Sequence, residues 1–167
     1  MFLPEIRFCG PRDVPAILEA NRLSPRPWPD ALVARDLMEP SRDGAPYDGP
    51  SYLGAFARTA DARLLGYAAM GYEAHEALLM GLMVLPAYRR RGIGLQLVAA
   101  VAECARSLGR TRLILRVGEA NGPARALYEA LFFRRKAVRE RYYSNGEDAV
   151  EMVLVLPRSP ETGREGG

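Results

Sequence analysis

Apolar residues follow two different periods along this chain, one typical of strands and one typical of helices. Apolar or alternating runs at residues 5–9, 51–58, 64–72 and 78–85 predict β-strands. The polar segment TADAR joins the second run to the third, so these two runs predict an antiparallel hairpin. The fourth run is uniformly apolar, which predicts a strand buried on both faces.

Helical spacing begins behind Asp13, which we expect to cap a first helix over residues 14–23. Prolines interrupt this pattern before it resumes over residues 31–38, which predicts a kinked helical pair. The best helix is predicted over residues 94–108, with Leu95 on its apolar face.

Further strands and one more helix complete the pattern. A strand is predicted over residues 112–117, a helix over 123–131, and closing strands over 136–143 and 149–156. Residues 39–50 are rich in proline and glycine, which predicts a surface loop. Strands that first pair as a hairpin and then alternate with helices indicate an α/β class with a mixed sheet.

Length and composition indicate one globular domain. The 167 residues, of which 49% are hydrophobic and 26% charged, can bury a sizeable core and are not biased toward disorder. We expect a single domain over residues 1–156 and a disordered tail over residues 157–167. No apolar run approaches the roughly 20 residues that cross a bilayer, so we expect no membrane association and a cytoplasmic location.

Charge and cysteine content narrow the function classes. The formal net charge of +3 suits an anionic ligand but falls short of a nucleic-acid footprint, so no direct nucleic-acid binding is expected. Lys136 is the only lysine, and arginine therefore supplies nearly all the cationic charge. Cys9 and Cys104 have neither a CxxC spacing nor a nearby histidine cluster, which indicates free thiols and no metal site.

The segment LMVLPAYRRRGIG, residues 82–94, carries the clearest chemical signal. An apolar strand runs into a basic turn with glycines, and this turn opens the best predicted helix. The first N–H groups of a helix lack partners, its dipole favours negative charge, and glycine lets a phosphate approach the backbone. The arginine run alone is compatible with solvated surface charge, but the order of elements favours a pyrophosphate site.

This segment resembles the GNAT acetyltransferases, whose pyrophosphate signature is matched by Arg89, Gly92 and Gly94. The resemblance implies a single-domain GNAT fold, in which helices flank a central mixed and mostly antiparallel sheet. It also implies acetyl-CoA as cosubstrate, no metal, and strand backbone groups beside the thioester. The coenzyme-binding residues that it implies are Leu82, Met83, Val84, Arg89, Arg90, Arg91, Gly92, Ile93, Gly94, Asn121 and Tyr128.

A second match to this family lies in NGPARALYEALFF, residues 121–133. The resemblance makes Asn121 a coenzyme ligand and Tyr128 the acid that protonates the departing thiolate. A tyrosine hydroxyl can donate this proton without being ionised at neutral pH. The structural alternative is that Tyr128 packs as a core residue and that Asn121 only caps a helix.

A third match, RYYSNGEDAVEM over residues 141–152, resembles protein N-terminal acetyltransferases of the RimI type. This resemblance implies that Tyr142 and Tyr143 hold the acceptor peptide. The segment RPWPDALVARDL also resembles the acceptor side of these enzymes, which implies that Trp28 contacts the acceptor. The alternative for the third match is an ordinary hairpin with strand tyrosines and a turn at its Asn-Gly pair.

The sequence departs from the RimI type at its expected general base. Arg116 stands where these enzymes carry a glutamate, and an arginine cannot accept a proton at neutral pH. Arg116 can instead orient a carboxylate or depress the pKa of a neighbouring amine. His75, the only histidine, is a candidate base, with a surface-loop histidine as the alternative. Phe132 stands where the family has glycine, so we expect a reshaped chain near Tyr128.

The resemblance implies an acetyl-CoA-dependent N-acetyltransferase that acts on a primary amine, foremost the N-terminal α-amine of a protein of the ribosomal-protein alanine type. Two alternatives stay open: a GNAT enzyme for a small-molecule amine, and a degenerate module that binds acyl-CoA without turnover. The expected partner is the N-terminal segment of an acceptor protein, with a ribosomal protein as a candidate. The sequence is compatible with a monomer or a homodimer.

Overall fold

The computed structural model describes residues 3–39 and 49–158. Its strands are β1 (Glu5–Phe8), β2 (Ser51–Phe56), β3 (Leu64–Glu73), β4 (Glu76–Val84), β5 (Arg112–Gly118), β6 (Arg134–Arg139) and β7 (Ala149–Val155). Its helices are α1 (Val14–Arg22), α2 (Asp30–Met38), α3 (Ile93–Ser107) and α4 (Gly122–Ala130), with short 3-10 turns η1 (Pro11–Asp13) and η2 (Pro86–Tyr88). Most of the predicted loop over residues 39–50, and nearly all of the predicted tail, lie outside the described residues.

The described strands form one seven-stranded sheet in the order β1-β2-β3-β4-β5-β7-β6. Only β4 and β5 pair in parallel, and the other neighbouring strands in this sheet are antiparallel. Ser51 lies opposite Met70, so β2 and β3 form the predicted hairpin. The predicted α/β class with a mixed and mostly antiparallel sheet is therefore confirmed.

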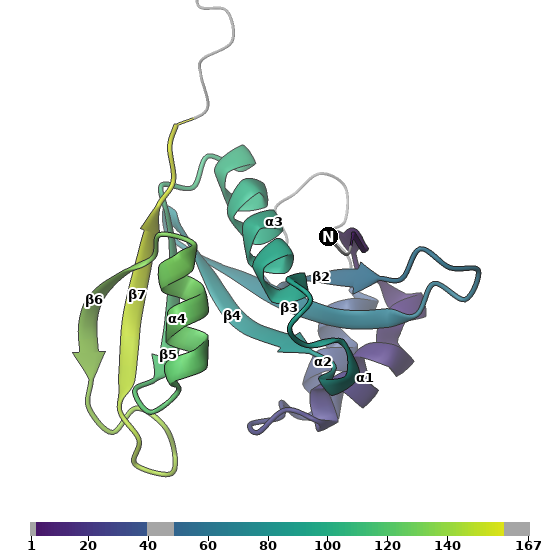
Figure 1. Ribbon diagram of the computed structural model, residues 1–167, viewed down its shortest axis with the longest axis horizontal. Coiled ribbons are helices and arrows are strands. Elements are labelled where there is room, and N and C mark those ends of the chain that lie inside the picture. Colours follow the sequence, from purple (N-terminus) through teal and green to yellow (C-terminus); the bar gives the residue numbers. More distant parts are fainter. Residues whose placement is uncertain (1–2, 40–48, 159–167) are drawn as a thin grey trace, which may run out of the picture.

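Helices cover both faces of the sheet: α3 and α4 lie on one face, and α1 and α2 on the other (Figure 1). Leu97 of α3 belongs to the core of the first face, and Ile17 and Val33 belong to the core of the second. The expectation that Leu95 is buried is wrong, since 38% of it is exposed. The buried stripe runs through Ile93 and Leu97, and Leu95 lies on the other side of the helix.

β4 and β5 pair only over their first halves and then diverge, as Figure 1 shows. The last parallel pair joins Leu79 to Leu115. A register shift between β3 and β4 leaves Met80 without an opposing residue, which is a β-bulge. The prediction that β4 is buried on both faces is wrong, because the divergence uncovers one face and leaves Met80 47% exposed.

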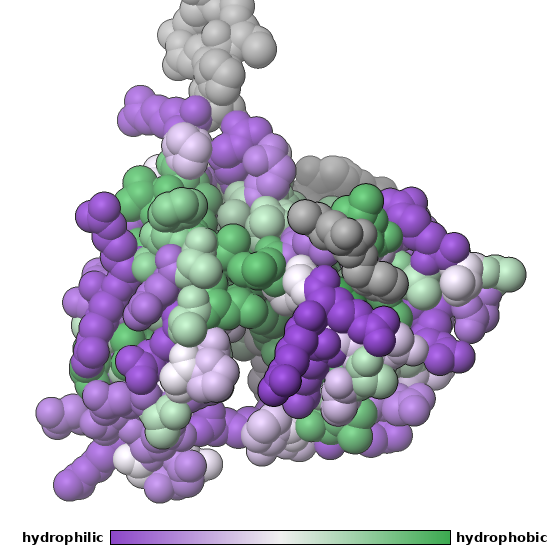
Figure 2. Space-filling model, viewed as in Figure 1, coloured by the Kyte–Doolittle hydropathy of each residue, from purple (hydrophilic) through white to green (hydrophobic). Residues whose placement is uncertain are grey.

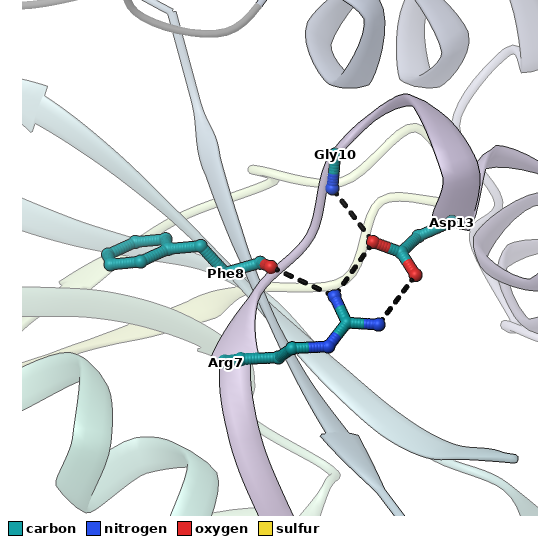
Figure 3. Close-up of polar contacts among 4 residues, drawn as sticks. All are labelled: Arg7, Phe8, Gly10 and Asp13. Atoms are coloured by element: carbon teal, nitrogen blue, oxygen red, sulfur yellow. Dashed lines mark hydrogen bonds and ion pairs between the residues drawn. The ribbon is translucent and has the colours of Figure 1, made fainter. Parts of the chain in front are cut away.

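Arg7 and Asp13 tie β1 to the start of α1 (Figure 3). Arg7 Nη1 and Nη2 each donate to one Asp13 carboxylate oxygen at 3.0 Å, and Gly10 N donates to Asp13 Oδ2 at 2.8 Å. The expected capping of α1 by Asp13 is therefore wrong, because Arg7 and Gly10 occupy its carboxylate. Burial alone raises the pKa of Asp13, but the hydrogen bonds from Arg7 and Gly10 lower it below its usual value.

The connection between β6 and β7 is longer than the sequence predicted. β6 ends early because Arg141 adopts a left-handed φ of 49°, which a strand cannot contain. Tyr142 and Tyr143 therefore lie in the connection, and the alternative of ordinary strand tyrosines is wrong. Gly146 turns the chain back with a φ of 84°, a conformation that favours glycine.

Both cysteines are free thiols, as predicted, and burial raises the pKa of Cys9 to about 12. Within residues 3–39 and 49–158, no helix is long and apolar enough to cross a membrane. The same residues contain no group of three or more His, Cys, Asp or Glu side chains arranged to hold a metal ion.

Candidate active site

A cleft of about 760 Å³ opens where β4 and β5 diverge. Figure 2 shows this face hollowed between α4 and the hydrophilic turn that leads into α3. Arg91, Tyr142 and His75 lie outside the cleft lining. The predicted site residues that line it are Trp28, Leu82, Met83, Val84, Arg89, Arg90, Gly92, Ile93, Gly94, Arg116, Asn121, Tyr128 and Tyr143.

The turn before α3 presents backbone amides to the cleft. Arg90 and Gly92 adopt left-handed φ values of 64° and 78°, and turns of this kind gather N–H groups into a concave anion site. The first helical hydrogen bond runs from Gln96 N to Gly92 O at 3.1 Å. The amides of residues 93–95 therefore have no partner within the helix, which fits a pyrophosphate at this end of the cleft.

The arginines of this turn have different surroundings. Arg89 Nε donates to Val84 O at 3.1 Å, which ties the turn to the end of β4. Arg90 also lines the cleft, so both side chains remain candidates for contacts with phosphate oxygens. The Arg91 guanidinium instead lies 5.6 Å from the centre of the Tyr88 ring, and Arg91 does not border the cleft.

Gly94 lies close to side chains of both cleft walls. A Cβ atom at Gly94 would lie 3.3 Å from Leu127 Cδ1, 3.7 Å from Val84 Cγ2 and 3.8 Å from Leu82 Cδ2. These side chains belong to α4 and β4, which form the two walls of the cleft beside α3. The close approach of a phosphate to the glycines of this turn stays a prediction, and Gly94 in addition leaves room between α4 and β4.

The second half of β4 offers backbone groups to the same cleft. Its pairing with β5 stops at Leu79, so the edge of residues 80–84 that faces β5 has no strand partner. Unpaired N–H and C=O groups on such an edge can bind an extended, amide-containing ligand. The pantetheine arm of acetyl-CoA has this chemistry, and the anion site lies at the end of the same strand. The cleft therefore fits the coenzyme that the resemblance implies.

Tyr128 of α4 lines the middle of the cleft and is only 8% exposed. Burial, with a smaller contribution from Tyr143, raises the pKa of Tyr128 to about 12. Its hydroxyl therefore stays protonated near neutral pH and can donate a proton. Asn121 Oδ1 accepts from Ala124 N at 3.2 Å, so Asn121 caps α4 and also borders the cleft.

Phe132 does not reshape the chain beside Tyr128. It adopts a left-handed φ of 70° directly after α4, the conformation for which glycine is suited. Phe133 N donates to Tyr128 O at 3.1 Å, and Phe132 N donates to Glu129 O at 3.0 Å. The expectation of a changed backbone is thus wrong, because the helix end closes normally and the Phe132 side chain points outward, with 82% of the residue exposed.

Trp28 lines the cleft, and residues that the sequence did not reveal hold it in place. The buried Asn21 donates from Nδ2 to Trp28 O at 2.8 Å and accepts from Trp28 N at 3.1 Å. A Cβ atom at Gly81 would lie 2.6 Å from the Trp28 ring, so only glycine lets the ring lie against β4. An isolated Asn in an amphipathic helix carries no sequence signal of this role.

Arg26 and Glu147 join the loop that carries Trp28 to the connection between β6 and β7. Arg26 Nη2 lies 2.7 Å from Glu147 Oε2, and its guanidinium stacks 3.6 Å from the centre of the Tyr143 ring. The Tyr143 hydroxyl donates to Arg116 O at 3.3 Å, which anchors the β6–β7 connection to β5. Tyr142 packs edge-on against Tyr143, with ring centres 5.0 Å apart, and its ring centre lies 5.8 Å from the Arg116 guanidinium, although Tyr142 is not part of the cleft lining.

Arg116 lies in the cleft, whereas His75 does not. His75 is in the turn between β3 and β4, and its carbonyl accepts from Thr111 N at 3.0 Å, at the end of β4 remote from the divergence. We therefore discard His75 as a base. Arg116 Nε and Nη2 lie 3.2 and 3.1 Å from Glu151 Oε1, so the arginine is held by the strand beside it.

Comparison with known proteins agrees with this geometry. Residues 15–133 match the acetyltransferase (GNAT) family. The chain belongs to this family. As a GNAT enzyme it is an acetyl-CoA-dependent N-acetyltransferase, which confirms the fold, the enzyme class and the cosubstrate predicted from the sequence.

Similar proteins include N-terminal acetyltransferases. The ribosomal protein bS18-alanine N-acetyltransferase of Salmonella typhimurium is 35% identical over 59% of this chain and 68% of its own length. The N-alpha-acetyltransferase RimI of Mycobacterium tuberculosis is 33% identical over 75% of this chain and 74% of its own length. The crystal structure of the Escherichia coli ribosomal-protein-S18-alanine N-acetyltransferase has a TM-score of 0.75 and 27% identity over 96% of this chain and 99% of that one.

Proposed function

We propose that this GNAT enzyme acetylates the N-terminal α-amine of a protein. The observation that carries the proposal is the composition of the cleft surface. Arginine, tyrosine and amide side chains line it, but among the described residues no Asp, Glu or His does. The cleft wall therefore presents no side chain suited to take a proton from a protonated amine.

A site without a base selects amines that are neutral on their own. An α-amine has a pKa near 7.7–8.0, so about a third of it is neutral at pH 7.5. A lysine side chain, with a pKa near 10.4, is neutral to only about 0.1% at the same pH. The positive charge of Arg116 further disfavours a nearby ammonium group. Both effects favour an α-amine over a lysine acceptor.

Different residues of the cleft bind the coenzyme and donate the proton. Acetyl-CoA supplies an acetyl group activated as a thioester. The amides of residues 93–95 and the side chains of Arg89 and Arg90 bind phosphate, and the free edge of β4 orients the acyl end. Tyr128 donates its proton to the sulfur as the new C–N bond forms and the C–S bond breaks. The proton released from the amine passes to solvent, and Tyr128 takes a proton from solvent before the next turnover.

The acceptor end of the cleft suits the extended N-terminal segment of a polypeptide. Trp28 and Tyr143 form its walls, and the Arg26–Glu147 pair links the two loops beside it. The Salmonella typhimurium relative acts, by its name, on the alanine of ribosomal protein bS18, so we propose a protein that begins with a small residue as acceptor. A ribosomal protein is the first candidate, which makes the cytoplasm the expected location.

The test uses purified protein, acetyl-CoA and a peptide that begins with alanine and contains one internal lysine. Mass spectrometry of the fragments should place the acetyl group on the α-amine and leave the lysine unmodified. The same peptide with a blocked N-terminus is the control and should not react. Acetylation confined to lysine would overturn the proposal, and coenzyme binding without any product would favour the alternative of a degenerate module.

A further inference from the structure

Arg116 occupies the point at which the sheet opens. It is the first residue of β5 beyond the last pair with β4, Leu79 and Leu115. Leu115 and Val117 belong to the core under α3 and α4. Because side chains alternate along a strand, Arg116 projects toward the other face, where Trp28 and the acceptor walls lie. About a quarter of its side chain is exposed, at 26%.

Glu151 holds Arg116 in one position. It lies directly opposite Arg116 in the β5–β7 register and is 4% exposed. Its Oε1 atom also lies 3.2 Å from Arg139 Nη2, so two guanidinium groups share one buried carboxylate. This cluster keeps a net positive charge, and Arg116 is its member on the cleft wall. The Arg116 guanidinium also lies 5.8 Å from the centre of the Tyr142 ring, and among the described residues Glu151 is the carboxylate that pairs with it.

Among the described residues, the charged side chains that line the cleft are all positive. They are all arginines, two near the phosphate end and two at the acceptor end, Arg26 and Arg116. Arg26 is neutralised by Glu147 at 2.7 Å and covered by Tyr143. Arg116 is therefore the cation at the acceptor end whose charge the neighbouring carboxylate does not fully balance. Such a fixed guanidinium favours an anionic group on the ligand and repels a cationic one.

We propose that Arg116 sets acceptor specificity by binding a carboxylate close to the acetylated amine, foremost an acidic side chain at the second position of the acceptor protein. This inference rests on the proposed N-terminal acetylation and adds a charge preference to it. An Asp or Glu at the second position places its carboxylate a few bonds from the reacting nitrogen. A free amino acid or acidic dipeptide offers the same chemistry, so the test must separate these sources.

The experiment compares peptides that begin Ala-Asp, Ala-Ala and Ala-Lys and are otherwise identical. We expect kcat/KM to fall in that order, with about a tenfold difference between the Asp and Lys peptides. Higher ionic strength should reduce this difference, because Arg116 is partly exposed. Equal kcat/KM values for the three peptides overturn the inference without any variant. If no peptide is acetylated, the proposed function itself fails.

Two variants locate the preference. Arg116→Glu alone places a carboxylate against Glu151, so the swap Arg116→Glu with Glu151→Arg is used, which restores an ion pair of opposite polarity. The swap removes the guanidinium from the cleft wall, and Arg139 keeps the cluster net positive, so the swap should abolish the preference for the Asp peptide. Arg112→Gln is the control: Arg112 lies on the same face of β5, pairs with Glu76 at 3.7 Å and is outside the cleft. It should keep the parental order.

The remaining outcomes are also decisive. An unchanged order of peptides in a folded swap variant means that Arg116 does not set the preference. Should the swap fail to fold, Arg116→Gln must reduce the difference between the Asp and Lys peptides, and an undiminished difference overturns the inference. Free aspartate and β-alanine are assayed beside the peptides. Faster acetylation of these amines than of any peptide keeps the carboxylate preference but overturns the peptide acceptor.

Discussion

The two ends of the cleft are built in different ways. The phosphate end comes from one continuous segment, residues 82–94, and consists mainly of backbone groups that a strand, a turn and a helix start leave unpaired. The acceptor end is assembled from segments far apart in the chain, and its walls are side chains such as Trp28, Arg116 and Tyr143. The backbone end serves a ligand common to the family, whereas the side-chain end can differ from one member to the next.

This difference predicts where substitutions act. A change at the phosphate end should weaken coenzyme binding for every acceptor. A change at the acceptor end should alter the choice or the affinity of the acceptor and leave coenzyme binding intact. Tyr128 stands between the two ends and should affect turnover alone.

The largest effect is expected for Tyr128→Phe, which removes the proton donor and keeps the ring packed against Phe133. The value of kcat should fall about 100-fold, because general acid catalysis commonly contributes 10²–10⁴. Calorimetry should show unchanged acetyl-CoA affinity. Tyr72→Phe, which removes a hydroxyl outside the cleft lining, is the control and should keep the parental kcat. Parental kcat in Tyr128→Phe would mean that the thiolate takes its proton elsewhere.

The pH profile tests whether the acceptor end lacks a base. Below the pKa of the acceptor amine, kcat/KM should rise about tenfold per pH unit, because only the neutral amine reacts. No fall should follow up to about pH 10, since the pKa of Tyr128 is about 12 and its proton is retained. The pH at which kcat/KM reaches half of its plateau should follow the amine pKa of each peptide. A fixed midpoint near pH 6–6.5 would instead reveal an enzyme base.

Gly94→Val tests the phosphate end. The new side chain would meet Leu127 Cδ1, which lies 3.3 Å from the position of Cβ, and would narrow the channel between α4 and β4. Acetyl-CoA affinity should fall about tenfold or more by calorimetry, equally for all acceptors. Gly10→Ala, where a Cβ meets no atom within 4 Å, should bind acetyl-CoA like the parent. Parental affinity in Gly94→Val would contradict the placement of the coenzyme arm.

Asp13→Asn tests the support of α1, the helix whose Asn21 holds Trp28 of the acceptor wall. Loss of the paired carboxylate should lower the free energy of unfolding by about 1–2 kcal/mol at pH 7. The pKa of Asp13 is lower in the folded state, so its contribution is present above about pH 4 and is lost as pH falls through the folded pKa. Urea unfolding of parent and variant should therefore converge at low pH. A difference that persists at pH 2 would assign the effect to something other than charge.

The smallest effect is expected for Glu147→Gln, which weakens the link to Arg26 across the acceptor entrance. The acceptor KM should rise about threefold, because partly exposed ion pairs contribute little, and coenzyme affinity should stay unchanged. Asp30→Asn breaks the exposed Arg22–Asp30 pair, which lies 2.7 Å apart outside the cleft. This control should keep the parental KM. A change in coenzyme affinity with Glu147→Gln would contradict the proposal that the acceptor end does not affect coenzyme binding.

The sequence by itself determined the fold class and the phosphate end. The spacing of hydrophobic residues identifies strands and helices, because each of these elements buries one face. The strand, turn and helix start of the phosphate end follow one another over residues 82–94, so a continuous stretch of sequence contains the whole signal. The family resemblance of residues 121–133 put Asn121 and Tyr128 forward, and both border the cleft, Asn121 as the N-cap of α4 and Tyr128 about two turns later. Signals that depend on neighbours within about ten residues are readable without coordinates.

Only the tertiary structure decided how the acceptor end is held together. The roles of Asn21, Gly81 and Glu151 depend on contacts between elements far apart in the chain, and no local pattern encodes them. Strand register put Glu151 opposite Arg116, and the same packing left His75 at the wrong end of β4. Sequence distance does not report spatial distance across a sheet, because pairing and divergence of strands are set by the packing of the whole domain.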